Sequence, residues 1–329
     1  MHDRKILELN RKAERYSKET DKLLEEMKNV IVGQDYVLER ILISLIADGH
    51  TLLEGMPGLA KTLMVSTLSS TMDAGFKRIQ FTPDLLPADI IGTKIYNQST
   101  AEFSTKKGPV FTNFILADEI NRAPPKVQSA LLEAMQERQV SISGETYPLE
   151  KPFLVLATQN PIETEGTYRL PEAQVDRFMF KLLVDYPSHP EEKEIVNRMT
   201  VGNNPIANQI INRNKILEMQ KFCTQIYSDE KIVHYAADLV QATRKPDEYG
   251  LDLNGLIEYG ASPRASIWMI LGGKAHAMIN GRGYVKPEDL KVIAHDVLRH
   301  RIMLTYEAEA EDVTTDSIIS QVVKAVQIP

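Results

Sequence analysis

Residues 55–62 read Gly55-Met56-Pro57-Gly58-Leu59-Ala60-Lys61-Thr62, between an apolar segment that predicts a strand over His50–Leu53 and a pattern that predicts a helix over Lys61–Ser70. The stretch follows the P-loop pattern of a Gly, four residues and then Gly-Lys-Ser/Thr, except that Ala60 replaces the second required Gly. Such a turn can fold around a phosphate, which backbone N–H groups and the positive end of the helix then hold. This strand, turn and helix favour an α/β fold with a nucleotide site.

The P-loop pattern also assigns roles to individual side chains. Lys61 is expected to neutralise charge on the β- and γ-phosphates of ATP, and Thr62 to offer its hydroxyl to Mg²⁺. The residues of this segment expected to bind nucleotide are Gly55, Met56, Pro57, Gly58, Leu59, Ala60, Lys61, Thr62 and Leu63. An ordinary Gly/Pro turn would not require Lys-Thr at the start of the helix.

A pair of acids supplies the second signal. Asp118 and Glu119 follow an apolar strand predicted over Phe114–Leu116, and a carboxylate in that position lies at the edge of a parallel sheet where ligands bind. We expect Asp118 to hold Mg²⁺ through water and Glu119 to orient and polarise the attacking water. The alternative is two solvated acids on a loop.

A third signal is Asn160, which follows the strand predicted over Phe153–Leu156. Its amide could hydrogen-bond the γ-phosphate or the attacking water. Asn160 precedes Pro161, so an ordinary Asn-Pro turn is an equal alternative on this feature alone.

The order of predicted elements indicates two domains. Strands alternate with helices up to about residue 158, which favours a parallel sheet of βαβ units. After 185–190, a segment with two prolines, only helical periodicity remains, at about 191–200, 214–226, 229–244, 264–280, 287–298 and 313–326. We predict a P-loop αβα core over 1–187, with an N-terminal helix, and a smaller all-helical lid over 188–329.

Composition excludes several classes of protein. The chain has 329 residues, 43% hydrophobic and 25% charged, with a net charge of −7, so a globally basic nucleic-acid binder is not indicated. The single cysteine, Cys223, rules out an internal disulfide framework and a Cys-rich zinc site, and we expect it to be buried and inert. No apolar run is long enough to span a bilayer and no signal peptide is seen, so a cytoplasmic location is expected.

In combination, the motifs resemble the AAA+ ATPases, and closely the MoxR family within the clade that carries an insert in helix 2. The segments that carry the resemblance are 32–34, 55–62, 80–87, 108–109, 118–123, 131–137, 157–161, 170–178 and 262–265. They run in order along nearly the whole chain. Ala60 is usual in MoxR proteins, so it does not put nucleotide binding in doubt.

The resemblance implies further roles. Asn160 would be sensor 1, Arg177 the arginine finger that reaches the γ-phosphate of a neighbouring subunit, and Arg264 the sensor 2 residue of the lid. Val32 and Gly33 would lie near the adenine. Such proteins act as rings, typically hexamers. The alternatives are that Arg177 pairs with a local acid and that Arg264 is simply exposed.

Two hairpins are also predicted. The first, within 91–111, has a polar tip and by resemblance forms part of the helix-2 insert, about 82–112, which projects toward the ring pore. The second spans Val140–Tyr147. Together the two hairpins contain few Lys or Arg residues, so they offer little positive charge for binding phosphates.

The function implied by the resemblance is Mg²⁺-dependent hydrolysis of ATP that remodels partner proteins, in complex maturation or in insertion of a metal cofactor. Client or adaptor proteins with von Willebrand factor A domains are common partners in this family. Three alternatives remain: a nucleotide-gated scaffold with little hydrolysis, a DNA-associated motor, and a chelatase-type motor of the same clade.

Overall fold

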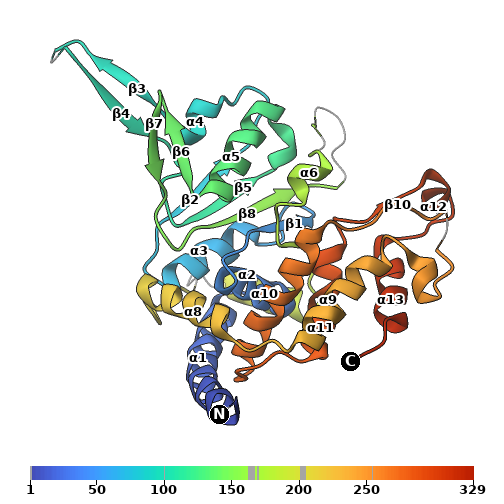
Figure 1. The fold of residues 1–329 in the computed structure, drawn as a ribbon. Coiled ribbons are helices and arrows are strands. Elements are labelled where there is room, and N and C mark those ends of the chain that lie inside the picture. Colours follow the sequence, from blue (N-terminus) through green and yellow to red (C-terminus); the bar gives the residue numbers. More distant parts are fainter. Residues whose placement is uncertain (1, 100, 162–166, 169, 201–204, 254) are drawn as a thin grey trace. The chain divides into compact units, whose positions relative to one another are not determined.

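The computed structural model describes residues 2–99, 101–161, 167–168, 170–200, 205–253 and 255–329. Residue contacts divide the chain into two compact units (Figure 1). The sheet unit comprises Lys22–Arg177 and Leu182–Leu217, and the helical unit comprises Met1–Asp21, Phe178–Lys181 and Glu218–Pro329. The predicted boundary at 187/188 is not one of these points of division, and the domain limits remain a prediction.

A five-stranded sheet in the order β2-β5-β8-β1-β9 organises the first part of the chain. Its strands are β1 (Thr51–Gly55), β2 (Phe76–Gln80), β5 (Phe114–Asp118), β8 (Leu154–Gln159) and β9 (Phe180–Val184). The pairs β2–β5, β5–β8 and β8–β1 are parallel, as predicted. The central strands β5 and β8 are almost continuously buried, as is typical of parallel strands covered on both faces.

The edge strand β9 was not predicted, whereas strands were predicted at β1, β5 and β8. It alternates buried and less buried residues over only five positions, which is a weak periodic signal. Its first two residues belong to the helical unit and its last three to the sheet unit.

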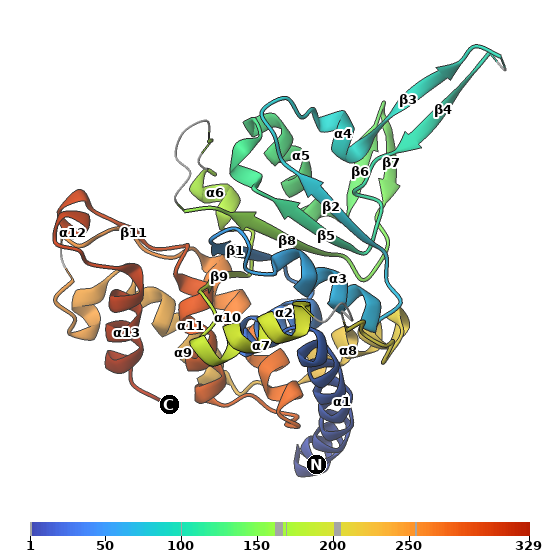
Figure 2. The same cartoon turned by 180° about the vertical axis from the view of Figure 1, so that it is seen from behind.

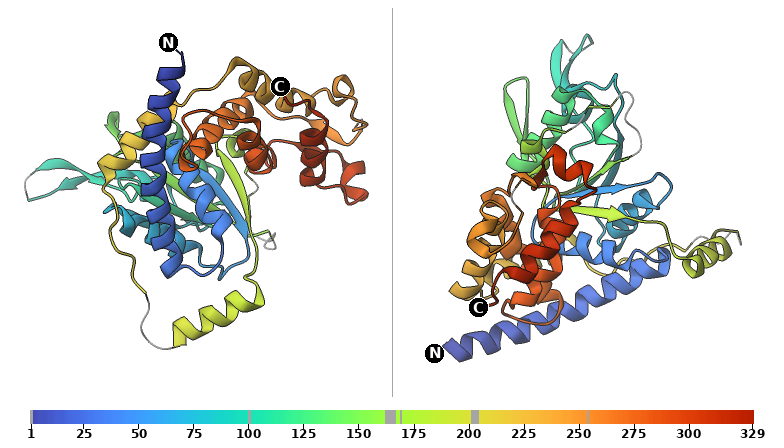
Figure 3. Two further views of the ribbon diagram at one scale, coloured as in Figure 1. Left: turned by 90° about the horizontal axis from the view of Figure 1, so that it is seen from below. Right: turned by 90° about the vertical axis from the view of Figure 1, so that its right-hand side faces the viewer.

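The N-terminal helix and the helix after the P-loop are present as predicted, as α1 (His2–Val30) and α3 (Lys61–Thr71). This part of the chain also contains α2 (Asp35–Ile46), α5 (Pro125–Glu137) and the short helices α4 (Pro87–Ile91) and α6 (Glu172–Val175). Figure 3 shows α1 as one long helix. Its first half belongs to the helical unit, where Asn10 accepts a hydrogen bond from the backbone N–H of Gly283 at 2.7 Å.

Helix α7 (His189–Thr200) belongs to the sheet unit (Figure 2). Arg198 on this helix donates to the carbonyl of Asn29 at the end of α1, at 2.8 Å. Glu191 lies so close to Gly33 that a Cβ at Gly33 would approach the Glu191 carboxylate to 2.7 Å. Because Gly33 also has a φ of +72°, both space and backbone conformation favour glycine there.

Both predicted hairpins are present, and they contact each other. They are β3 (Gly92–Asn97) with β4 (Glu102–Lys107), which extends away from the sheet in Figure 1, and β6 (Gln139–Ile142) with β7 (Glu145–Pro148). The Lys94 ammonium lies 2.7 Å from the Glu145 carboxylate, and the Thr105 and Tyr147 hydroxyls are 3.0 Å apart. One of the few hairpin lysines is therefore already paired with an acid.

The helical unit contains the later helices at nearly the predicted positions. They are α8 (Arg213–Gln225), which begins in the sheet unit, α9 (Glu230–Ala242), α10 (Pro263–Ile279), α11 (Pro287–Leu298) and α13 (Thr315–Ala325). The short helix α12 (Tyr306–Ala310) was not predicted. A two-stranded antiparallel sheet, β10 (Ile257–Tyr259) with β11 (Met303–Leu304), was not predicted, because strands this short show no readable alternation. Cys223 is buried as expected, and burial raises the pKa of its thiol to about 12.

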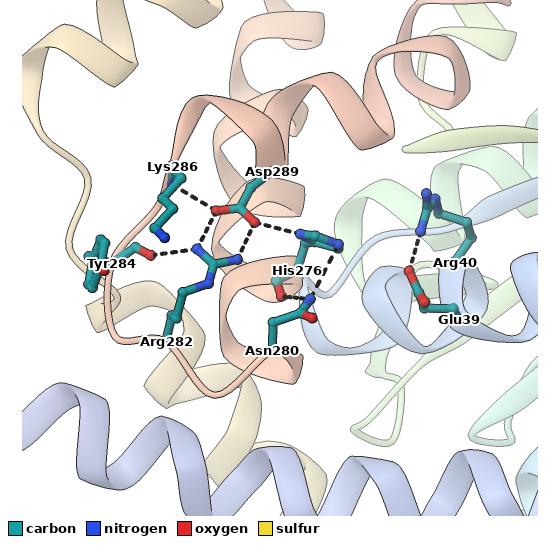
Figure 4. Close-up of polar contacts among 8 residues, drawn as sticks. All are labelled: Glu39, Arg40, His276, Asn280, Arg282, Tyr284, Lys286 and Asp289. Carbon is teal, nitrogen blue, oxygen red and sulfur yellow. Dashed lines mark hydrogen bonds and ion pairs between the residues drawn. The ribbon is translucent and has the colours of Figure 1, made fainter.

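Asp289 organises the polar interior of the helical unit (Figure 4). Its carboxylate accepts two hydrogen bonds from Arg282, at 2.8 and 2.5 Å, and one from the backbone N–H of Lys286 at 2.7 Å. The His276 ring nitrogen Nδ1 lies 2.6 Å away. Burial alone would raise the pKa of Asp289, but these hydrogen bonds outweigh it and hold the pKa below its ordinary value.

We predict that Asp289→Asn destabilises the protein by about 3 kcal/mol, because it removes the charge that compensates Arg282 inside the unit. In the wild type this contribution is fully present above the unfolded pKa of about 3.9, and is lost as the pH falls through the lower folded value. Urea unfolding at neutral pH measures the change. The control is Glu248→Gln, which removes an exposed ion pair with Lys245 and should cost less than about 1 kcal/mol. Equal losses in both variants would contradict the prediction.

No helix among the described residues has the length and apolar composition needed to cross a membrane.

Candidate nucleotide site

A cavity of about 390 Å³ lies where β1, β5 and β8 end. The residues that line it come from the P-loop segment and from the ends of neighbouring strands: Gly55, Pro57, Gly58, Leu59, Ala60, Lys61, Thr62, Leu63, Arg78, Asp118, Glu119, Thr158 and Asn160. The three separate sequence signals therefore converge on one cavity. Because the strands are parallel, their carboxyl ends meet at one edge of the sheet.

Glycine is favoured at two positions of the P-loop for different structural reasons. Gly58 has a φ of +85°, a conformation that favours glycine, and a Cβ there would meet no atom within 4 Å. Gly55 has an ordinary φ, but a Cβ there would lie 2.5 Å from the backbone oxygen of Val184 in β9. Ala60, at the N-cap of α3, has a φ of +55°, which explains why glycine commonly occupies this position of the motif.

Lys61 lies inside the cavity with its ammonium held by the loop. Its Nζ donates a hydrogen bond of 2.5 Å to the carbonyl of Gly55. Burial lowers the pKa of Lys61, and the negative charges of Asp118, Glu119 and Glu54 oppose that shift. The site thus contains one partly buried cation among carboxylates, an arrangement suited to an anion accompanied by a metal ion.

Asp118 is fixed by two neighbours. The Thr158 hydroxyl donates to Oδ1 at 2.7 Å, and Arg78 donates to Oδ2 from Nε at 3.0 Å and from Nη2 at 2.5 Å. Each carboxylate oxygen keeps further acceptor capacity.

Glu119 is held by side chains from two other segments. Its Oε2 accepts a hydrogen bond from Gln80 at 2.8 Å and one from Arg122 at 2.9 Å. Its backbone has a φ of +55°, and its N–H donates to the Thr158 hydroxyl at 2.8 Å. A carboxylate that is oriented at the end of a strand in this way can orient a water molecule.

A second, more apolar cavity of about 200 Å³ shares Gly58, Leu59, Ala60 and Leu63 with the first. The rest of its lining is Val30, Ile31, Val32, Gln34, Pro187, Ile195, Arg198 and Met199. Apolar side chains with a few polar groups at their edge suit a flat heterocyclic base. Val32 lies in this lining and Gly33 is its neighbour in the chain; their place near the adenine remains a prediction.

Four predicted residues lie outside the linings of both cavities: Met56, Gly33, Arg177 and Arg264. Arg177 instead lines a third cavity, of about 270 Å³, with Ser129, Glu133, Gln136, Glu137 and Gln174. Its Nε is buried and makes no hydrogen bond within the described residues. Arg264 opens helix α10 of the helical unit, where its backbone N–H donates to the Ser262 hydroxyl.

The donor set fits a metal ion that arrives with phosphates. Within the described residues, no group of three or more His, Cys, Asp or Glu side chains converges as a metal site. The cavity offers a hydroxyl, from Thr62, and a carboxylate, from Asp118, which are the oxygen donors that Mg²⁺ prefers. Mg²⁺ commonly takes one or two protein ligands together with substrate phosphates and water, which matches this set.

Sequence reasoning missed Arg78, Gln80 and Thr158. The first two lie on β2, whose end pairs with β5 so that Gln80 is opposite Asp118. A polar residue at the end of a strand that pairs with the acid-bearing strand could have indicated these positions. That inference requires the order of the strands in the sheet, which the sequence does not show. Arg122, three residues after Glu119 in the chain, also reaches the site, where its guanidinium lies 2.9 Å from the Glu119 carboxylate.

Comparisons with known proteins agree with this geometry. A model of the ATPase family associated with various cellular activities (AAA) matches residues 50–180, and a model of the AAA lid domain matches residues 253–322. The fold and site therefore define an AAA-type ATPase core with its lid, which confirms the predicted fold class.

The relatives identify the family. The chain is 52% identical over 305 residues to Chaperone MoxR1 of Mycobacterium tuberculosis, covering 92% of this chain and 81% of that protein. It is 43% identical over 310 residues to the protein YeaC of Bacillus subtilis, covering 94% of each. A crystal structure of a candidate ATPase from Cytophaga hutchinsonii superposes with a TM-score of 0.92 at 52% identity, covering 97% of each chain. The chain belongs to the MoxR family of AAA+ ATPases.

We predict that Gly55→Ala destabilises the protein more than Gly58→Ala does. The first change places a methyl group against the Val184 carbonyl, so the strand must shift, whereas the second adds only a left-handed backbone penalty of about 1–2 kcal/mol. Thermal unfolding of both variants without nucleotide measures the difference. A larger loss for Gly58→Ala would contradict the close approach of β9.

Proposed function

We propose that the protein binds ATP with Mg²⁺ at the 390 Å³ cavity and hydrolyses it to ADP and phosphate. The observation that carries the proposal is the convergence there of Lys61, Thr62, Asp118, Glu119 and Asn160, beside an apolar pocket sized for a base. Membership of an ATPase family supports it independently.

We assign each side chain a role. Lys61 and the N-terminus of α3 would hold the β- and γ-phosphates, and Thr62, together with Asp118 acting through water, would hold Mg²⁺. When bound, Mg²⁺ neutralises charge that develops on the phosphates. Glu119, kept in place by Gln80, orients and polarises the attacking water, and Asn160 contacts the γ-phosphate or that water. Catalysis rests on positioning and charge stabilisation.

We further propose that the active assembly is a ring, a hexamer by family resemblance, in which Arg177 completes the site of a neighbouring subunit. Arg177 lines a cavity of its own rather than the nucleotide cavity, which favours action in trans. Arg264 of the helical unit would contact the nucleotide as sensor 2. An arginine finger can contribute about 10³–10⁵ to the rate.

The work of hydrolysis is proposed to be remodelling of partner proteins in the cytoplasm, during complex maturation or metal cofactor insertion, with von Willebrand factor A domain proteins as candidate partners. The name of the M. tuberculosis relative, a chaperone, supports this choice. The net charge of −7 and the pairing of Lys94 with Glu145 weigh against a DNA motor. A chelatase-type role would differ mainly in the client.

We predict that Lys61→Ala and Glu119→Gln each lower the ATPase kcat at least about 10²-fold, because each removes charge stabilisation or orientation needed only in the transition state. Arg177→Ala should lower kcat similarly, and the wild-type specific activity should rise with protein concentration as rings form. Steady-state phosphate release with Mg²⁺ measures all four.

Glu248→Gln is the matched carboxylate-to-amide control, since Glu248 lies in an exposed pair with Lys245. If the wild-type protein binds ATP but hydrolyses none at any protein concentration, the motor proposal is wrong and the nucleotide-gated scaffold takes its place. Full activity in Arg177→Ala would contradict only the assignment of Arg177 as the arginine finger and would leave the ATPase proposal in place.

A further inference from the structure

The turn that follows α11, Arg299-His300-Arg301, binds the backbone of the segment that follows Arg177. The carbonyl of Phe178 accepts hydrogen bonds from Arg301 Nη2 at 2.5 Å and from His300 Nε2 at 3.1 Å. Arg301 Nη1 donates to the carbonyl of Met179 at 3.2 Å, and Arg299 Nη1 to that of Lys181 at 2.7 Å. Three consecutive side chains thus satisfy three carbonyls about 120 residues earlier in the chain.

The side chains of the same segment are fully buried. Phe178, Met179 and Phe180 are each 0% exposed and belong to the helical unit. Helix α10 makes room for them at Gly272, where a Cβ would lie 2.9 Å from the Met179 methyl carbon and 2.6 Å from Ile293 Cδ1. Main-chain hydrogen bonds and side-chain packing therefore both fix this segment to the helical unit.

The charges of the turn are arranged for these contacts. Arg299 binds Asp316 through Nε at 2.8 Å and Nη2 at 3.0 Å, which leaves Nη1 for the Lys181 carbonyl. Burial lowers the pKa of His300 well below its ordinary value, as do the neighbouring cations. Since a carbonyl only accepts, the neutral His300 ring carries its proton on Nε2. Arg301 is 6% exposed, and its bonds to carbonyls satisfy a cation that would otherwise be costly to bury.

The position of this segment bears directly on Arg177. The peptide bond from Arg177 to Phe178 joins the two units, and consecutive Cα atoms are fixed about 3.8 Å apart. The hydrogen-bonded carbonyl of Phe178 therefore belongs to the residue next to Arg177, with no flexible segment between them. A translation of the Phe178 backbone must therefore be followed by the backbone of Arg177.

We propose that Arg299, His300 and Arg301 are positioning residues for Arg177. Through these three residues the helical unit determines the position of the arginine finger. The proposal rests on the proposed function, in which Arg177 completes a neighbouring site. It assigns the turn an effect on the next subunit's catalysis rather than on nucleotide binding in its own subunit. Misplacing a catalytic group by about 1 Å can cost about 10²-fold in rate.

The test uses Arg301→Lys, which keeps the charge but loses the forked donors, and His300→Leu, which removes the second donor to Phe178. We expect each to lower kcat about 10-fold or more, within the range allowed for misplacement, with the KM for ATP and binding of a fluorescent ATP analogue nearly unchanged. Arg282→Lys is the matched control: it weakens a buried arginine pair in the same unit and does not touch the 178–181 segment.

Mixed rings separate positioning of the finger from a local structural defect. Glu119→Gln subunits lack hydrolysis at their own site but carry an intact Arg177, so mixing them with Arg301→Lys or His300→Leu subunits should give more activity than the two separate activities added together. Urea unfolding shows that each variant is folded before mixing, and either variant suffices if the other does not fold.

Failure of the proposal and failure of the proposed function give different results. If Arg177→Ala recovers activity on mixing with Glu119→Gln but neither turn variant does, the turn does not position the finger. Loss of kcat in Arg282→Lys equal to that in Arg301→Lys overturns the proposal in the same way. If Arg177→Ala itself shows no recovery, the finger assignment falls first and the positioning role falls with it.

Discussion

The register between β5 and β8 is the constraint on which the candidate site depends. Parallel pairing sets Leu116 opposite Leu156 and Ala117 opposite Ala157, which brings Thr158 beside Asp118. The Thr158 hydroxyl then donates to the carboxylate of Asp118 and accepts from the N–H of Glu119. A slip of one residue would turn Thr158 to the other face of the sheet and separate these groups. Buried apolar residues along both strands specify the register that the polar site requires.

The contiguous parts of the site could be predicted because each carries its chemistry in one short segment. Residues 55–62 specify a phosphate loop, and Asp118 with Glu119 follows a recognisable apolar strand. Arg78 and Gln80 could not be predicted in the same way, since their partners lie about 40 residues away and are brought close only by the pairing of β2 with β5. Gly55 was predicted to allow a phosphate turn, whereas its neighbour in the structure is Val184 of β9.

A similar distinction holds for the fold. The helices of the second half were predicted closely because periodic apolar positions repeat over several turns. Segment 178–181 gave no such signal, being four residues whose partners are Gly272 and the turn 299–301. Local sequence shows neither that these residues leave the sheet unit nor that buried carbonyls there need donors, because both facts arise from packing between distant segments.

Three of the nine non-glycine residues with positive φ among the described residues lie where the nucleotide is proposed to bind. Gln34, Ala60 and Glu119 have φ between 55° and 60°, and each lines at least one of the two adjoining cavities. Such conformations cost non-glycine residues about 1–3 kcal/mol each and persist only where neighbours enforce them. Gln34 is held through its amide on the carbonyl of Asp185, and Glu119 through Thr158 and Gln80. Because these restraints come from β8, from the end of β2 and from the residue that follows β9, the sheet supplies the rigidity that keeps the cavity in shape before any ligand enters.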